Sequence, residues 1–168
     1  MTNSRNSDIR QIKKADLKYV CQSWLYDYQE SPEWSMPGVI SEDYFGYQHK
    51  LIDDILPRAS KAGTAYIMNE PGQPHLYRGW LVAEPYADLP VVHYMKVKKG
   101  AKKQGVATAL LERFYKDFGY VKGEHNLVYT HSAKDIAKSV YLQKKVKEWS
   151  GVYLPPFKYT LAAPGWEA

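Results

Sequence analysis

The sequence is poor in cysteine and contains no long hydrophobic run. Its single cysteine, Cys21, excludes an intramolecular disulfide. No apolar stretch approaches the roughly 20 residues that a membrane-spanning helix needs. The first seven residues are polar and contain no apolar signal core. Together these absences favour a cytoplasmic protein without a membrane segment.

Several catalytic motifs are also missing. The Gly-Lys-Ser/Thr ending of a P-loop and the Gly-x-Ser-x-Gly elbow of α/β hydrolases are both absent. No Cys/His cluster has metal-ligand spacing, so we expect no metal site. Arginine is scarce, since 18 of the 23 basic residues are lysines. Because arginine is the commonest reader of guanine edges, this scarcity argues against sequence-specific DNA binding.

The remaining composition is that of a globular domain. Hydrophobic residues make up 45% of the 168 residues, which is enough for a sizeable core. We find no internal repeat or linker, and therefore expect one domain over 1–168, with a flexible N-terminus at 1–7. The net charge of +5 suits an anionic ligand, and nucleic acid is one possibility. Aromatic residues gather before residue 50, either as core or as the wall of an acceptor pocket.

Hydrophobic periodicity predicts a mixed order of strands and helices. Proline and glycine separate these segments, and we expect Pro57 to help end the second helix and 69–75 to form a turn. Such an order predicts an α/β layer with a mixed sheet. The predicted strands are 8–12, 64–68, 77–84, 91–97 and 127–130, with strand-like pieces at 151–154 and 157–161, and the predicted helices are 16–28, 41–57, 106–118 and 132–146.

The loop between the strand 91–97 and the helix 106–118 is the most informative stretch. Five of the lysines lie between Lys96 and Lys103. Gly105 lets backbone and ligand approach closely, because it has no Cβ. The first N–H groups of a helix have no partner inside the helix, and the helix dipole adds positive charge there. The loop therefore predicts a site for a phosphorylated small molecule.

Lys102-Lys103-Gln104-Gly105-Val106-Ala107 resembles the Arg/Gln-x-x-Gly-x-Gly/Ala loop of the GNAT N-acetyltransferases, with Lys at the first position. It stands five residues beyond Val97, in the register of that family. The element order also resembles the GNAT fold over nearly the whole chain. The segment 80–97 with the loop that follows it is similar to uncharacterised bacterial and phage members of that family. The resemblance implies an α/β (α+β) fold with a mixed, mostly antiparallel central sheet, splayed parallel fourth and fifth strands, and flanking helices. It also implies acetyl-CoA as cofactor, with its pyrophosphate on Lys102, Lys103, Gln104, Gly105, Val106, Ala107 and Thr108.

The same resemblance implies that the thioester lies between the strands 91–97 and 127–130. Met95, Lys96 and Val97 would then contact the cofactor. Strand amides around Met95 and Val97 would bond the pantetheine arm and the acetyl carbonyl. A peptide N–H aimed at that carbonyl also stabilises the oxyanion of the transition state.

Three residues are candidates for proton transfer. Ala137-x-x-x-Tyr141 resembles a GNAT motif whose tyrosine protonates the departing thiolate. Lys134 stands where that motif often has an Asn. The alternative for Tyr141 is a residue that only packs in the core. His93 is the candidate general base, because its ordinary pKa suits proton transfer near neutral pH. Alternation would place His93 on one face with Val91, Met95 and Val97; the alternative is a histidine that only packs on that face. Glu84 is the rival base, and His131 is a further residue that could line the acceptor side.

The sequence therefore predicts an N-acetyltransferase that moves an acetyl group from acetyl-CoA to an amine by direct attack, without a covalent enzyme intermediate. The acceptor is a small-molecule or protein amine, which the sequence does not identify. One alternative is a module of the same fold that binds nucleic acid without acetylation. Another is an acyltransferase that acts on a nucleic-acid amine. We expect a monomer or a homodimer.

Overall fold

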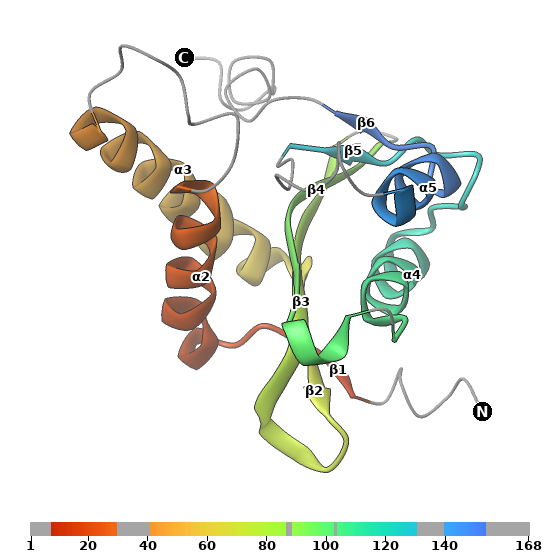
Figure 1. Cartoon of the computed structure of the whole chain (residues 1–168), viewed down its shortest axis with the longest axis horizontal. Helices are drawn as coiled ribbons and strands as arrows, with labels where there is room; N and C mark the ends of the chain where they lie inside the picture. The colour runs from red at the N-terminus through yellow and green to blue at the C-terminus, as the bar shows by residue number, and fades with distance from the viewer. Residues whose placement is uncertain (1–7, 30–40, 87–88, 103, 131–139, 154–168) are drawn as a thin grey trace.

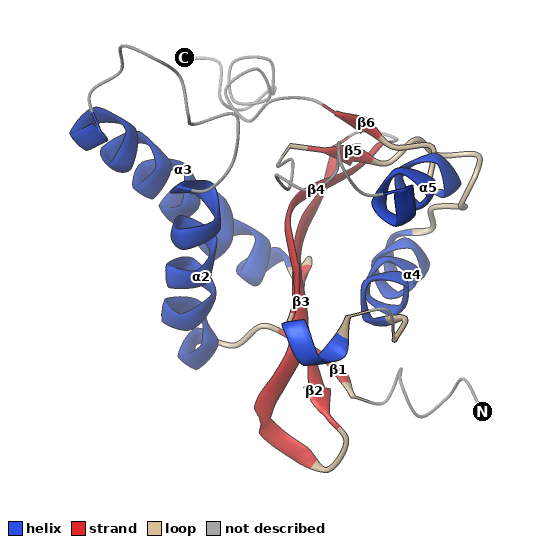
Figure 2. Ribbon diagram, viewed as in Figure 1, coloured by secondary structure: helices blue, strands red, loops and turns tan. Residues whose placement is uncertain are grey.

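The fold is a six-stranded sheet with helices on both faces. The computed structural model describes residues 8–29, 41–86, 89–102, 104–130 and 140–153; the side chains of 28–29, 41–48 and 140–142 are outside this description. Figure 1 shows α2 and α3 on one side of the sheet and α4 and α5 on the other. Figure 2 shows the same layers by secondary structure. None of the described helices is both long and apolar enough to cross a membrane.

The strands follow one another across the sheet in chain order, β1 to β6. The first four are antiparallel neighbours, whereas β5 is parallel to β4 and β6 is parallel to β5. This confirms the predicted mixed sheet with parallel fourth and fifth strands. The bounds are β1 Ile9–Gln11, β2 Ala65–Glu70, β3 Gln73–Tyr86, β4 Leu89–Val97, β5 Val128–Tyr129 and β6 Val152–Tyr153.

Four α-helices and two short 3-10 turns complete the described elements. They are η1 Lys14–Asp16, α2 Leu17–Gln29, α3 Ser41–Ala62, η3 Lys99–Ala101, α4 Val106–Phe118 and α5 Val140–Glu148. The bounds of α4 agree with the prediction, and Gly119 ends the helix as expected, in the left-handed region at φ 74°. Residues 131–139 and 154–168 lie outside the described residues, as do the predicted start of the last helix and the strand-like piece at 157–161.

The two faces of the sheet bury separate hydrophobic cores. On one face, α2 and α3 pack through Trp24, Ile52 and Ile55 against strand residues that include Trp80. On the other face, α4 packs through Leu110 and Phe114, and Trp149 just after α5 joins the same core. Burying such side chains contributes about 1.5–3 kcal/mol each. Packing on both faces therefore holds the sheet in place, including the strand β4.

Two local predictions were wrong. Pro57 does not end the second helix, because α3 continues to Ala62 with Pro57 inside it. Proline inside a helix costs about 3 kcal/mol, but Ala59 beyond it is fully buried in the core, and this packing keeps the chain helical. The predicted turn at 69–75 is also too long. Here β2 and β3 form a hairpin that turns only at Pro71 and Gly72, with Gly72 at φ 71°.

Candidate active site

The strand β4 contains a β-bulge in its middle. Val82 of β3 pairs with Tyr94, but the next residue of β3, Ala83, pairs with Val92, so His93 is the extra residue. As a result Met95 and Val97 pack toward α4 together with Val92, not with His93. The expected face of Val91, His93, Met95 and Val97 is therefore not formed. A one-residue insertion reverses the alternation of every residue before it.

Beyond the bulge, β4 has an edge that no strand of the described residues covers, which we call the open edge. β5 pairs with β4 only at Val91 and Val92, and the N–H of Thr130 donates to the Val92 carbonyl at 3.0 Å. The N–H of Lys98 donates to β3 at 2.9 Å. Because the direction of backbone bonding alternates along an antiparallel strand, the N–H groups of Met95 and Val97 point away from β3. Within the described part of the chain, no strand residue pairs with them on that side.

The loop after β4 ends on an uncapped helix start. Gly105 is the N-cap residue of α4 at φ 79°, a conformation that favours glycine, and it offers no side-chain cap. The carbonyl of Gly105 accepts the N–H of Ala109 at 3.0 Å, which begins the helix. The N–H groups of Val106, Ala107 and Thr108 come before this first intrahelical bond. This turn of α4 can therefore bind an anion through its backbone.

A glycine in the sheet sets the distance between this helix start and β4. A Cβ on Gly79 of β3 would lie 2.6 Å from the carbonyl oxygen of Lys96 and 2.9 Å from a methyl group of Val106. The absence of a side chain at Gly79 lets the first residue of α4 rest directly on the sheet. The open edge of β4 and the uncapped start of α4 are thereby neighbours.

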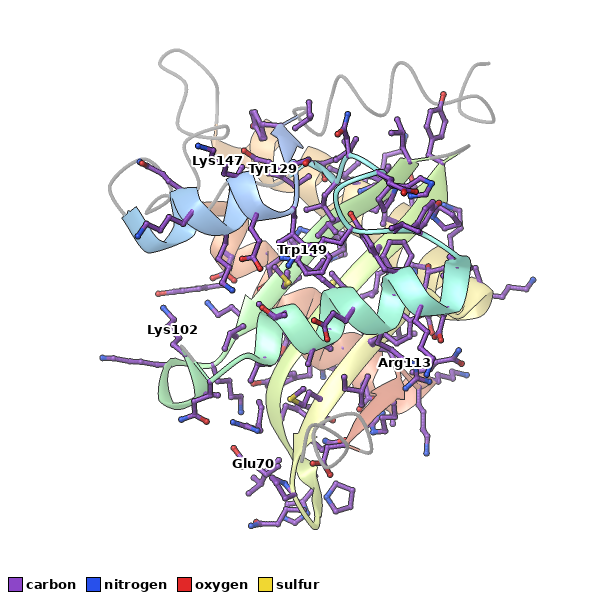
Figure 3. All side chains as sticks on the ribbon, turned by 90° about the vertical axis from the view of Figure 1, so that its right-hand side faces the viewer. Glu70, Lys102, Arg113, Tyr129, Lys147 and Trp149 are labelled. Carbon is purple, nitrogen blue, oxygen red and sulfur yellow. The ribbon has the colours of Figure 1, made fainter. Side chains whose placement is uncertain are left out.

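Side chains fix the loop to the rest of the protein. Arg78 of β3 donates to the Gln104 side-chain oxygen, and the Gln104 amide donates to the carbonyl of Gly100 at 3.3 Å. Lys102 is exposed at the loop, as Figure 3 shows, and Lys103 lies outside the described residues. Gln104, one of the predicted phosphate-binding residues, therefore uses its side chain to hold the loop against β3.

The helix α5 adds a cation that the sequence analysis missed. The Lys145 ammonium donates to the Thr108 hydroxyl in the first turn of α4 at 3.3 Å, and it lies 3.3 Å from Glu148. The Glu148 carboxylate offsets part of this charge, but it is shared with Lys122, which lies 2.5 Å from it. Lys145 thus adds positive charge where the N–H groups of α4 already point. Only tertiary packing reveals this residue, because α4 and α5 are separated in the sequence.

The predicted base and its rival form one buried network. His93 is 1% exposed, with Nε2 3.3 Å from Glu84 and Nδ1 hydrogen-bonded to the Thr130 hydroxyl at 3.3 Å. Glu84 also accepts from Arg58 of α3 at 2.7 Å. Burial lowers the pKa of His93 despite the carboxylate beside it. Burial also opposes ionisation of Glu84, but His93 and Arg58 outweigh it and lower the pKa of that carboxyl.

A second polar cluster lies on the α2 side of β4. The Tyr94 hydroxyl donates to the Asp27 carboxylate and is 2.9 Å from the Ser23 hydroxyl. The Lys96 ammonium is 3.1 Å from the same carboxylate. Burial and the Asp27 charge raise the pKa of Tyr94, so its hydroxyl stays protonated. The structure thus directs the Lys96 side chain to α2, away from the open edge.

Two of the lysines between Lys96 and Lys103 are engaged by side chains of α2. Lys96 pairs with Asp27, and the Lys98 ammonium lies 5.7 Å from the ring centre of Tyr19. Lys99 and Lys102 are exposed. Lys96 and Lys98 therefore have partners within the protein, whereas Lys99 and Lys102 face solvent. This difference argues against a nucleic-acid patch made by the whole cluster.

The side chains of two predicted site residues lie outside the described part of the chain. The backbone of Tyr141 lies at the start of α5, but its side chain is outside the described residues. His131 lies wholly outside them. Both remain predictions.

Comparison with solved structures identifies the architecture. A GCN5-related N-acetyltransferase from Ralstonia eutropha is 17% identical over 81% of this chain and 89% of its own, with a TM-score of 0.51. YycN from Bacillus subtilis is 14% identical over 82% and 88%, with a TM-score of 0.53. The chain has the GNAT fold. An integron cassette protein from a salt-marsh metagenome is similar too, at 11% identity over 87% and 86% and a TM-score of 0.50. No protein-family model and no curated protein match the sequence.

Proposed function

We propose that this protein is an N-acetyltransferase that transfers an acetyl group from acetyl-CoA to an amine. The observation that carries the proposal is the open edge of β4 beside the uncapped start of α4. Met95 and Val97 turn their N–H groups away from β3, and Gly105 leaves the first turn of α4 without a cap. The start of α4 suits the diphosphate of a long ligand, and the strand N–H groups suit the amide-bearing arm of the same ligand.

The residues fit the cofactor by the chemistry of their donors. The backbone of Val106, Ala107 and Thr108 would hold the diphosphate, with Lys145 supplying charge. Met95 and Val97 would bond the pantetheine arm and the acetyl carbonyl. Acetyl-CoA supplies an activated thioester, and a preorganised strand N–H stabilises the oxyanion that develops when the amine attacks. No covalent intermediate on the protein is needed.

Two proton transfers complete the proposed reaction. Tyr141 protonates the departing thiolate. His93 accepts the proton of the attacking amine at Nδ1, through water and the Thr130 hydroxyl that lies 3.3 Å from that nitrogen, while Glu84 near Nε2 stabilises the imidazolium that forms, as a carboxylate does in a catalytic triad. This role is supported by the 3.3 Å separation of His93 and Glu84 and by a lowered His93 pKa, which keeps the ring neutral before the reaction. Since His93 is buried, the relay through water is part of the proposal.

Turnover is tested by following CoA release from acetyl-CoA with a panel of amines that includes small polyamines, peptides and oligonucleotides. Amine-dependent CoA release is the expected result. Tyr141→Phe should lower kcat by about 10²-fold or more and leave CoA affinity close to that of the parent. Unaltered kcat would make Tyr141 structural. If calorimetry detects no heat with CoA at all, and oligonucleotides instead bind with steep salt dependence, the nucleic-acid module is the correct reading.

A further inference from the structure

Three side chains of different chemistry converge between α2 and α3, on the face of the sheet opposite α4. Cys21 belongs to α2, and His49 and Asp53 belong to α3. One donor atom of each lies within 4.8 Å of the donor atoms of the other two. His49 Nδ1 is 2.8 Å from Asp53 Oδ2. Within the described part of the chain, no other three such groups come together in this way.

The backbone beneath this group is firmly held. His49 and Asp53 are four residues apart on α3, so they share one face of that helix. Directly below, Val20 and Trp24 of α2 and Ile52 of α3 are fully buried in the common core. The two helices are therefore fixed relative to each other, while the side chains of His49 and Asp53 are 47% and 57% exposed. A ligand site built on helices is positioned more precisely than one built on loops.

A cysteine, a histidine and a carboxylate can form either a nucleophilic triad or a metal site. In a triad the thiol and the carboxylate sit at opposite ends of the imidazole, roughly 7 Å apart when both are in hydrogen-bond reach of the ring. Here the thiol and the carboxylate also approach each other within 4.8 Å. Convergence on one point is the geometry of a metal site.

We propose that Cys21, His49 and Asp53 bind a divalent cation of the zinc class. Sulfur, nitrogen and oxygen donors together suit Zn²⁺ or Co²⁺, whereas Mg²⁺ and Ca²⁺ prefer oxygen alone. A tetrahedral zinc ion holds such donors about 3.3–3.6 Å apart, so small rotations of the two exposed side chains complete the site. Water takes the fourth position. The cation displaces the thiol proton to solvent and forms the metal–sulfur bond.

Such an ion would connect α2 to α3. It would act on the helix pair opposite α4 without touching the open edge of β4 or the start of α4, so the inference is independent of the acetyltransferase proposal. The proposal differs from the sequence analysis, which predicted no metal site because Cys21 is remote in the sequence from the other two residues. Only the four-residue spacing of His49 and Asp53 was visible in the sequence.

Cobalt substitution tests the site sharply, because Cys21 is the sole cysteine. Any thiolate-to-cobalt charge-transfer band must therefore come from Cys21. Titration of the reduced, tag-free protein with Co²⁺ should give such a band that saturates at one ion per chain. Zn²⁺ should displace the cobalt and, at a hundredfold excess over its Kd, raise the Tm by roughly 5–10 °C.

Matched variants separate the site from adventitious binding. Cys21→Ser should abolish the band, and His49→Gln and Asp53→Asn should each weaken cobalt binding at least about tenfold. Asp54→Asn, the next residue on α3, and His75→Gln in the β2–β3 hairpin should bind as the parent does; both residues are exposed. The proposal is overturned if cobalt binds without the band, if Zn²⁺ leaves the Tm unchanged, or if His49→Gln or Asp53→Asn binds cobalt normally.

Discussion

His93 lies wholly inside the protein, between the Thr130 hydroxyl on one ring nitrogen and the Glu84 carboxylate near the other. Burial is the larger influence on its pKa, and it favours the neutral ring. Burial therefore resists the uptake of a proton by His93, although the Glu84 carboxylate beside it favours that uptake. The same arrangement makes the folded protein sensitive to acid.

The pH dependence of stability follows from the sign of that shift. The unfolded chain gains a proton at His93 near pH 6.5, the ordinary value, whereas the folded chain resists protonation until lower pH. The stability contributed by neutral His93 is therefore complete above pH 6.5 and lost as the pH falls below it. Thermal melts between about pH 7 and pH 5 should show a steeper fall of Tm for the parent than for His93→Gln.

The exposed His75 provides the control, because His75→Gln should retain the parental slope. If the Tm of His93→Gln falls with pH as steeply as that of the parent, the buried state of His93 is not what couples stability to pH.

At the scale of elements, the contact between α4 and the sheet depends on Gly79. A methyl group there would overlap the Lys96 carbonyl and Val106. Gly79→Ala should therefore destabilise the protein by about 1–3 kcal/mol, as overpacking does. Denaturant unfolding measures this as a lower midpoint at constant m-value.

Gly100→Ala is the matched control, since a Cβ at Gly100 meets no atom within 4 Å. Equal midpoints for the two variants would contradict the close approach of α4 to β3. A further consequence is that Gly79→Ala should also weaken CoA binding, because it displaces the start of α4.

Element boundaries were predictable where local chemistry decides them. The apolar face of α4 and the glycine that ends it are both local signals, and both were correct. The β-bulge at His93 was not predictable, because it depends on how Val82 and Ala83 pair across the sheet. The continuation of α3 through Pro57 was missed for a similar reason, since the burial of Ala59 is a tertiary effect.

At the scale of the whole molecule, the order of elements was sufficient to predict the GNAT fold, and the parallel pairing of β4 and β5 confirms its central feature. The loop near Gly105 was visible because glycine and lysine are concentrated there. The partners that complete the candidate site were not visible. Lys145 meets Thr108 across 37 residues, and Tyr94 meets Asp27 across 67. Such pairs arise from packing and have no local pattern.

The central claim is that backbone N–H groups at the start of α4 hold the diphosphate of CoA. Calorimetric titration of CoA into the parent, Gly105→Glu and Gly100→Glu tests it most directly, because both variants add the same charge to one loop. The account predicts binding by the parent, at most a few-fold loss in Gly100→Glu, and at least a tenfold loss in Gly105→Glu. Should the φ of 79° prevent Gly105→Glu from folding, Lys145→Gln replaces it, with a several-fold loss expected. Equal affinity in Gly105→Glu and Gly100→Glu, or in Lys145→Gln and the parent, would contradict the claim.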